Sequence, residues 1–129
     1  MILVDSSVII DYIDKANPVI IRTLRQVQPA IAGIIRAEVL AGASTSAKWD
    51  RISVALDDFD YLAFPETLWD QVARHSLQLR FSGYKFPFND VAIATLALHY
   101  DCELWTRDKQ FALIQSVLPS LKLFQEPAS

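Results

Sequence analysis

The chain opens with Met1-Ile2-Leu3-Val4-Asp5-Ser6-Ser7, in which a short apolar run ends directly in a carboxylate. Residues 2–4 are predicted to form a buried strand, so Asp5 comes at its carboxyl end. Open α/β sheets bind ligands at that edge. The stretch therefore predicts a first strand that presents Asp5 to a site. The alternative is that Asp5, Ser6 or Ser7 caps the helix that follows.

Outward from this stretch, short apolar runs alternate with helical patterns, which is typical of β-α units on a parallel sheet. Further strands are predicted at 30–33, 61–64, 103–106 and 121–124. Helices are predicted at 7–13, 19–27, 35–43, 47–58, between Pro65 and Gly83, and at 91–98. The helix at 91–98 is apolar almost all round and is expected to be sandwiched in the core. The tail, residues 125–129, is expected to fray.

Composition limits the alternatives. A chain of 129 residues with 52% hydrophobic content has the size of one domain, residues 1–129. Asp5 interrupts the N-terminal apolar run, so neither a signal peptide nor a membrane span is predicted, and a cytoplasmic protein is expected. Cys102 is the only cysteine, which excludes a disulfide framework, and His75 and His99 are interpreted as structural. The net charge of −3 argues against a general polyanion binder.

Three further acids lie where a folded domain rarely places a charge. Glu38 has only uncharged neighbours three and four residues away on its predicted helix, so its carboxylate needs a cation or a donor, or else a distant arginine. Asp90 begins an apolar helix, where the helix dipole also favours an acid and where Asn89 is an alternative cap. Asp108 follows the predicted strand 103–106 and, like Asp5, lies at a carboxyl end.

If the strands before Asp5 and Asp108 are neighbours, these two acids lie side by side, and the helices with Glu38 and Asp90 can reach the same edge. Two carboxylates about 4 Å apart repel by roughly 4 kcal/mol at an effective dielectric of 20, so four ionised acids need protons or dications. An all-oxygen ligand set favours Mg²⁺ or Mn²⁺ over zinc. The sequence thus predicts a divalent-metal site.

Four segments of the chain resemble the motifs of the PIN-domain nucleases and, among them, of the VapC-type toxins. They are residues 2–7 (ILVDSS), 36–42 (RAEVLAG), 89–94 (NDVAIA) and 104–111 (LWTRDKQF), which span nearly the whole chain in order and spacing. The resemblance implies a three-layer α/β/α fold with a central, mostly parallel, five-stranded sheet. It also implies an endoribonuclease dependent on Mg²⁺ or Mn²⁺, and a homodimer inhibited by a small cognate antitoxin.

The resemblance also assigns roles to residues. The catalytic, metal-ligating acids of the family fall on Asp5, Glu38, Asp90 and Asp108. Its supporting hydroxyls fall on Ser7 and Thr106. The position after the first acid, commonly Thr in the family, is Ser6 here, and we expect little consequence. The chemistry implied is metal-assisted hydrolysis of RNA phosphodiesters, with the acids as ligands and not as nucleophiles. Whether one or two ions bind stays open.

RNA needs cations beyond the metal, because its backbone is polyanionic. Candidates near the motifs are Arg36, Arg80, Lys85, Arg107 and Lys109. Each is otherwise a solvated surface charge. The aromatic side chains of Tyr84, Phe86 and Phe88 either stack on bases or pack beneath their loop or in a dimer interface.

Two other protein classes need residues that this chain lacks. A phosphoacceptor receiver domain needs an additional acidic pair and a lysine after the last strand, which the chain lacks. An aspartyl phosphatase needs a second Asp two residues after Asp5, where the chain has Ser7. A catalytically inactive PIN-like module that binds RNA or protein remains the alternative.

Overall fold

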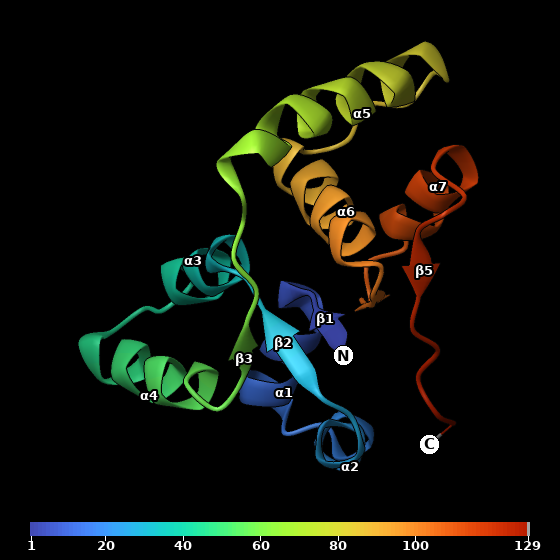
Figure 1. The fold of residues 1–129 in the computed structure, drawn as a ribbon. Coiled ribbons are helices and arrows are strands. Elements are labelled where there is room, and N and C mark those ends of the chain that lie inside the picture. The colour runs from blue at the N-terminus through green and yellow to red at the C-terminus, as the bar shows by residue number, and fades with distance from the viewer. Residues whose placement is uncertain (129) are drawn as a thin grey trace.

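The computed structural model describes residues 1–128 and contains one five-stranded, all-parallel sheet with helices on both sides (Figure 1). The strands are β1 (Ile2–Val4), β2 (Pro29–Ile31), β3 (Asp60–Tyr61), β4 (Glu103–Trp105) and β5 (Lys122–Leu123). They lie in the order β3-β2-β1-β4-β5. The predicted α/β class with a parallel five-stranded sheet is confirmed.

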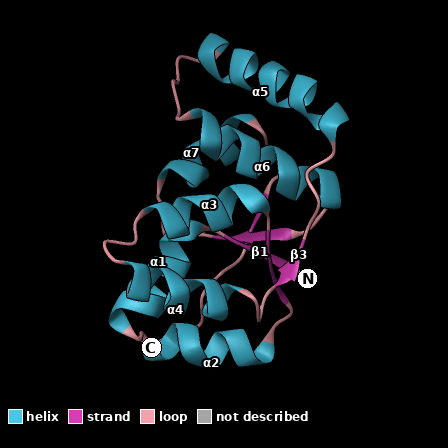
Figure 2. Ribbon diagram, turned by 90° about the vertical axis from the view of Figure 1, so that its left-hand side faces the viewer, coloured by secondary structure: helices cyan, strands magenta, loops and turns pink. Residues whose placement is uncertain are grey.

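The helices form two groups, one on each side of the sheet (Figure 2). The first contains α1 (Ser6–Lys15), α2 (Pro18–Gln26), α3 (Gly33–Ala41) and α4 (Ser46–Leu56). The second contains the short 3₁₀ helix η1 (Glu66–Leu68), α5 (Trp69–Phe81), α6 (Phe88–Tyr100) and α7 (Gln110–Val117). No helix within residues 1–128 is long and apolar enough to cross a membrane.

The core surrounds the central strands and contains buried side chains of α1 to α4 as well as those of α6. Leu3 and Val4 of β1 and Leu104 and Trp105 of β4 are completely buried. Every residue of α6 from Val91–Ala97 is buried too, which confirms that this helix is sandwiched in the core. Burying one such aliphatic side chain contributes about 1.5–3 kcal/mol, so the strands nearest the acids are also the most firmly held.

Some predicted boundaries were wrong, in one case because a helix begins sooner than the apolar pattern indicates. The strand predicted at 30–33 ends at Ile31, since Ala32 is the N-cap of α3 and Gly33 its first residue. The strand predicted at 61–64 is only Asp60–Tyr61, although the amide of Leu62 still donates to the carbonyl of Ile31 at 2.9 Å. Helix α7 occupies a segment where no helix was predicted.

Helix α5 ends in a Schellman motif at Gly83, as the sequence predicted. The amide of Tyr84 donates to the carbonyl of Leu79 (3.0 Å), and the amide of Gly83 donates to that of Arg80 (2.9 Å). Gly83 adopts φ = 92°, a left-handed conformation that glycine tolerates best. The motif fixes the direction in which the loop 82–87 leaves the helix.

The strand order creates a topological switch point. The chain runs from β1 outward through β2 and β3, then returns to the other side of β1 to form β4 and β5. Crevices in open parallel sheets lie at such a point, outside the carboxyl ends of the two strands. Here those ends carry Asp5 and the segment 106–108, so the topology brings Asp5 and Asp108 to the same edge of the sheet.

Candidate active site

Asp5 lies at the end of β1 and is only 4% exposed. It holds the N-cap position of α1, yet its side chain makes no capping hydrogen bond. Its Oδ2 instead accepts two hydrogen bonds, from Ser7 Oγ (2.7 Å) and from Thr106 Oγ1 (2.8 Å). The side chain of Asp5 therefore does not cap α1, and the hydroxyls of Ser7 and Thr106 fix its orientation.

The same hydroxyls join the ends of β1 and β4. Ser7 Oγ accepts from the amide of Arg107 (3.0 Å), and Thr106 Oγ1 accepts from the amide of Asp108 (3.0 Å). Because each hydroxyl gives its one proton to Asp5, the 3.3 Å approach of the two oxygens to each other is a packing contact. No hydrogen bond within residues 1–128 engages Asp5 Oδ1, which leaves that oxygen available as a ligand.

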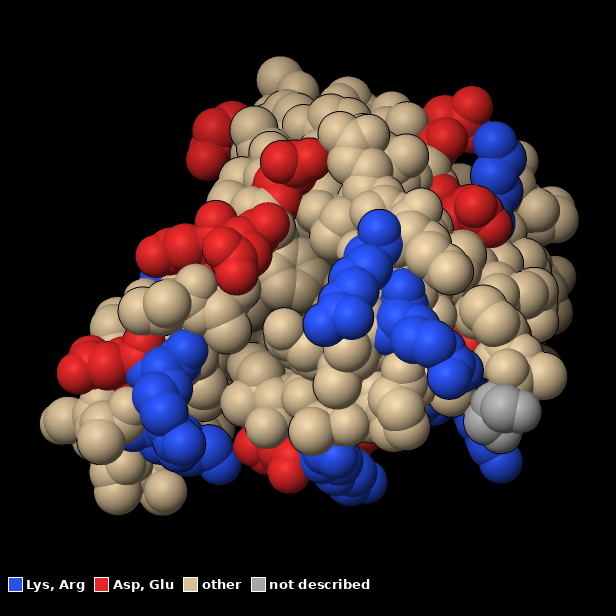
Figure 3. All heavy atoms as spheres, turned by 90° about the horizontal axis from the view of Figure 1, so that it is seen from below, with Lys and Arg blue, Asp and Glu red and all other residues tan. Residues whose placement is uncertain are grey.

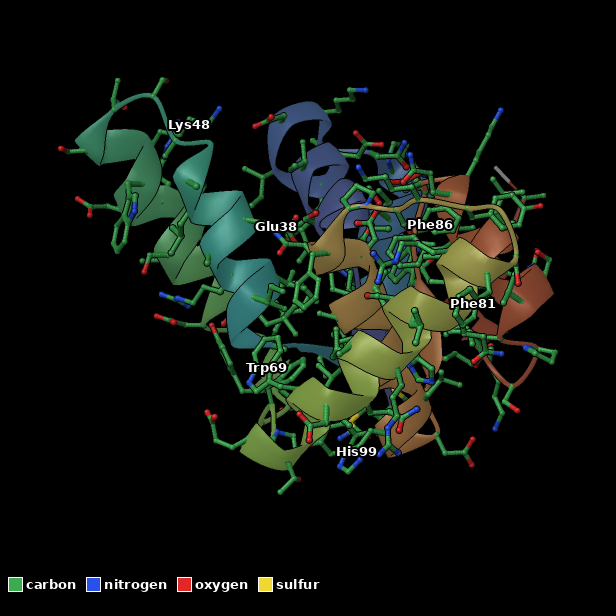
Figure 4. All side chains as sticks on the ribbon, turned by 90° about the horizontal axis from the view of Figure 1, so that it is seen from above. Glu38, Lys48, Trp69, Phe81, Phe86 and His99 are labelled. Carbon is green, nitrogen blue, oxygen red and sulfur yellow. The ribbon has the colours of Figure 1, made fainter. Side chains whose placement is uncertain are left out.

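Glu38 lies on α3 opposite the start of α6 (Figure 4). Its Oε1 is buried and has no hydrogen-bond partner in the described part of the chain. Burial raises the pKa of the Glu38 carboxyl, and the charge of Asp5 raises it further. A hydrogen bond from the side chain of Asn89 lowers this pKa, but by less. A buried carboxylate oxygen without a donor is costly unless a proton or a cation meets it.

Asp90 lies in the first turn of α6, whose N-cap is Pro87, so Asn89 is not the cap. The pKa of Asp90 is raised from 3.8 to about 6, first by burial and then by the charges of Asp108, Asp5 and Glu38. The structure thus brings the four predicted acids within electrostatic reach of one another. Asp108 is further oriented by the amide of Gln110, which donates to its Oδ1 at 3.0 Å.

The four acids are close to one another but are not arranged as the ligands of a metal ion. Within residues 1–128, no three His, Cys, Asp or Glu side chains stand in the geometry of a metal site. The donor set itself fits a hard cation: all four groups are carboxylates, and Glu38 Oε1 has no other partner. The assignment of these acids as metal ligands therefore stays a prediction.

No arginine or lysine among residues 1–128 neutralises any of the four acids. Arg36 pairs with Asp57 (3.0 Å) and also donates to Tyr61 and Ser53, while Arg107 pairs with Asp11 and Glu126. Of the five cations predicted to contact RNA, Arg36 and Arg107 are thus engaged within the protein. On the face shown in Figure 3, basic and acidic side chains are interspersed.

Glu126 is a residue that the sequence reasoning missed. It lies in the tail that was expected to fray, but it is held by Arg107 Nε (2.6 Å) and Nη2 (2.9 Å) and by the indole Nε1 of the buried Trp105 (3.0 Å). The expectation of fraying is therefore wrong for Glu126. The two residues that it holds flank Thr106, so the tail supports the loop that carries the acidic site.

His75 matches its structural interpretation. Its Nδ1 lies 2.8 Å from Thr95 Oγ1 and its Nε2 lies 2.9 Å from Gln71 Nε2. Because Thr95 donates its proton to the carbonyl of Val91, the imidazole must donate from Nδ1 and accept at Nε2. Burial lowers the pKa of His75, which favours this neutral form.

The sequence and the fold are similar to those of known proteins. The family model described as PIN domain matches residues 2–116. Among solved structures, VapBC2 from Rickettsia felis bound to a promoter DNA fragment matches with a TM-score of 0.85 and 20% identity, over 98% of this chain and 100% of that one. VapBC-1 from nontypeable Haemophilus influenzae matches with a TM-score of 0.80 and 20% identity, over 97% and 98%. A toxin-antitoxin complex from Klebsiella pneumoniae matches with a TM-score of 0.69 and 25% identity, over 98% and 100%. No curated protein matches the sequence.

Proposed function

The chain belongs to the PIN domain family, and from that premise we propose that it is a divalent-metal-dependent endoribonuclease. We propose further that it is the toxin of a toxin–antitoxin pair, since the structures named above are of such complexes. We place the protein in the cytoplasm. The observation that carries the nuclease proposal is the buried Oε1 of Glu38, which has no partner within residues 1–128 and belongs to an acidic cluster that no lysine or arginine of those residues neutralises.

In the proposed site, Asp5, Glu38, Asp90 and Asp108 hold Mg²⁺ or Mn²⁺. When bound, the ion supplies positive charge for the developing phosphorane and lowers the pKa of the attacking water. Ser7 and Thr106 keep Asp5 Oδ2 occupied, so that Oδ1 would be the oxygen available to an ion. The amide of Gln110 orients Asp108 in the same way. These supports fix the ligands before the ion arrives, which reduces the cost of binding it.

The direct test is cleavage of total RNA by purified protein in Mn²⁺ and in EDTA. The wild type should cut only with the ion, while Asp5→Ala and Asp90→Ala should lose the activity and keep the fold. Asp58→Asn is a suitable control, because Asp58 is an exposed acid outside the cluster. Wild-type protein that folds but leaves RNA intact in Mn²⁺ would contradict the proposal.

That outcome would favour the alternative, a catalytically inactive PIN-like module that binds RNA or protein. One observation supports it: no three acids among residues 1–128 already converge on a single point. Growth arrest on expression without a partner separates the two, since an inactive module should be harmless.

Two apolar surfaces suit the proposed protein partners. A hollow of about 520 Å³ between α1, α2 and α4 is lined by Ile13, Ile21 and Ile52, and we place a segment of the antitoxin there. On α5, Leu77 and Phe81 are 44% and 81% exposed, and we place the second copy of a homodimer over them. Ile21→Glu, at a half-buried residue of the lining, should abolish rescue by a co-expressed antitoxin, and Phe81→Glu should convert a dimer to a monomer in light scattering.

A further inference from the structure

A second hollow opens beside the acidic cluster, between the C-terminal half of α5, the loop 82–87 and the first turn of α6. Its volume is about 310 Å³, at the small end of the roughly 300–1,000 Å³ typical of small-molecule sites. Its walls are mostly apolar. It is lined by Ala73, Ser76, Leu79, Arg80, Tyr84, Lys85, Phe86, Phe88 and Val91.

The aromatic side chains in this hollow leave ring surface uncovered. The rings of Tyr84 and Phe86 lie 5.7 Å apart at 32°, a tilted contact that does not seal one face against the other. Phe88 lies at the rim, where it is stacked with Trp69 (6.4 Å between ring centroids, 9° between planes) and still 54% exposed. The Schellman motif at Gly83 sets the backbone position of Tyr84, whose amide donates to the carbonyl of Leu79, another residue of the lining.

The polar groups in the hollow are also unpaired. Arg80 and Lys85 are exposed and form no ion pair with any other residue of the described chain. Ser76 Oγ is buried and has no hydrogen-bond partner within residues 1–128. Two free cations and one unsatisfied hydroxyl around aromatic faces match a planar, polar ligand with negative charge on either side.

We propose that this hollow binds one unstacked base of single-stranded RNA, with Arg80 and Lys85 on the flanking phosphates. The inference rests on the proposed nuclease function and adds to it a subsite that selects single-stranded substrate. Bases within a duplex are stacked on both faces and present no free ring surface, whereas an unpaired base can lie on an aromatic side chain.

The position of the hollow relative to the acids supports this occupant. Phe88 and Val91 line it from one side of the first turn of α6, and Asp90 leaves the same turn on another side. A helix with its side chains is about 10 Å across, so a strand that crosses this turn can place a base in the hollow and a phosphate at the acids.

A second copy of the chain is the rival occupant, because Phe81 lies nearby. A twofold contact centred on the hollow would bring Arg80 and Lys85 close to their own counterparts, and like charges in an interface are unfavourable. The proposed dimer contact over Leu77 and Phe81 can lie beside the hollow without filling it. Charge therefore favours a polyanion as the occupant.

The experiment measures binding of a short, fluorescein-labelled, single-stranded RNA to Asp5→Asn protein in EDTA, by anisotropy. The Asp5 change prevents cleavage and lies outside the hollow. Adding Phe86→Ala or Phe88→Ala should weaken binding about 5- to 150-fold. Adding Arg80→Ala or Lys85→Ala should weaken it and reduce the slope of log K against log salt by about 0.7 each. Duplex RNA of the same sequence should compete poorly.

Arg74→Ala is the matched control, since Arg74 is an exposed arginine on α5 that does not line the hollow. Equal losses for Arg74→Ala and Arg80→Ala would overturn the proposal, as would undiminished binding in both phenylalanine variants. Phe88 is more exposed than Phe86, so Phe88→Ala keeps the test valid if Phe86→Ala does not fold. A change of oligomeric state without a change in RNA affinity would overturn it in favour of a self-interface.

The experiments distinguish failure of the nuclease proposal from failure of the proposed base-binding hollow. If wild-type protein does not cut RNA in Mn²⁺ but the hollow variants lose binding, the nuclease proposal fails and the subsite stands. If the wild type cuts and the hollow variants bind and cut equally well, the subsite fails and the nuclease proposal stands.

Discussion

Replacing Asp90 with asparagine should make the metal-free protein more stable at neutral pH. The Asp90 carboxylate is half-buried, and burial together with the charges of Asp108, Asp5 and Glu38 raises its pKa to about 6. An amide of nearly the same shape keeps the packing at the start of α6 and removes the charge. A residue retained for the fold alone would show the opposite effect.

The size of the gain follows from the pKa shift. Asp90 moves from 3.8 to about 6, roughly two units, and each unit corresponds to about 1.4 kcal/mol, so the variant gains up to about 3 kcal/mol above pH 6. An unfolding entropy of about 2.1 cal/mol/K per residue makes 1 kcal/mol worth about 4 °C for a chain of this length. The melting temperature should therefore rise on the order of 10 °C.

The gain should depend on pH in a defined way. Between pH 3.8 and about 6 the folded wild type binds more protons at Asp90 than the unfolded chain does, so its stability falls as the pH rises through this window and levels off above it. The Asp90→Asn variant should not lose stability at this residue as the pH rises. The difference between the two proteins should be small near pH 4 and complete by about pH 7.

The assay is thermal unfolding of both proteins in EDTA across this range, followed by circular dichroism, and then repeated with Mn²⁺. The ion should stabilise the wild type and narrow the difference, because it binds only the folded state. Asp58→Asn serves as the control for a general change in net charge. Equal melting temperatures for wild type and Asp90→Asn at neutral pH would refute the reasoning, and a wild type indifferent to Mn²⁺ would count against the metal site.

Three further changes test the supports around the acids. Glu126→Ala removes the acceptor of the Trp105 indole and should cost about 1–3 kcal/mol in denaturant unfolding, whereas Glu126→Gln should keep much of that stability; equal losses would contradict the role of the indole bond. Thr106→Val leaves the amide of Asp108 without its acceptor and should cost about 1–3 kcal/mol while lowering the stabilisation by Mn²⁺; unchanged melting with and without the ion would oppose this. His75→Gln should reduce the loss of stability on acidification below pH 6.5, because the lowered pKa of His75 makes the unfolded chain bind the proton more tightly; identical pH profiles would exclude it.

The fold was predictable where a single local signal decides it. The apolar run ending at Asp5 gave the first strand and its carboxyl end, and β1 ends at Val4 as expected. The all-round apolar pattern at 91–98 indicated the buried helix, since only a helix covered on every side tolerates it. Boundaries were less predictable, because Ala32 and Gly33 fit the end of a strand and the start of a helix equally well.

Helix α7 was missed although its signal was present. Phe111 and Ile114 are buried on one face of the helix, and Leu118 continues that face just beyond its end. Their spacing of three and four residues is the helical period, but the segment is short and directly follows Asp108, whose predicted role is chemical. A functional interpretation of one residue thus obscured the pattern of the next eight.

The supports of the site could not be predicted from the sequence. Arg107 and Glu126 are 19 residues apart, and nothing in the local pattern of the tail marks Glu126 as a partner of a buried tryptophan. Similarly, the engagement of Arg36 with Asp57 depends on how α3 packs against α4. Long-range pairing of exposed charges has no period in the sequence, so such contacts appear only when the elements are placed.

That the four acids gather was predictable, because topology and chemistry point to the same edge, whereas their role as metal ligands stays a prediction. Strand order brings Asp5 and Asp108 to the switch point between β1 and β4, while Glu38 and Asp90 reach it from α3 and α6. Each of these charges opposes the others, and burial adds to the cost at Glu38 and Asp90. Folding alone gives no reason to keep such an arrangement, because neutral residues of similar size would be more stable there. A stability cost concentrated at the ligand-binding edge of a parallel sheet, with hydroxyls and amides already orienting Asp5 and Asp108, is the expected signature of a site built for a cation that the chain does not itself provide.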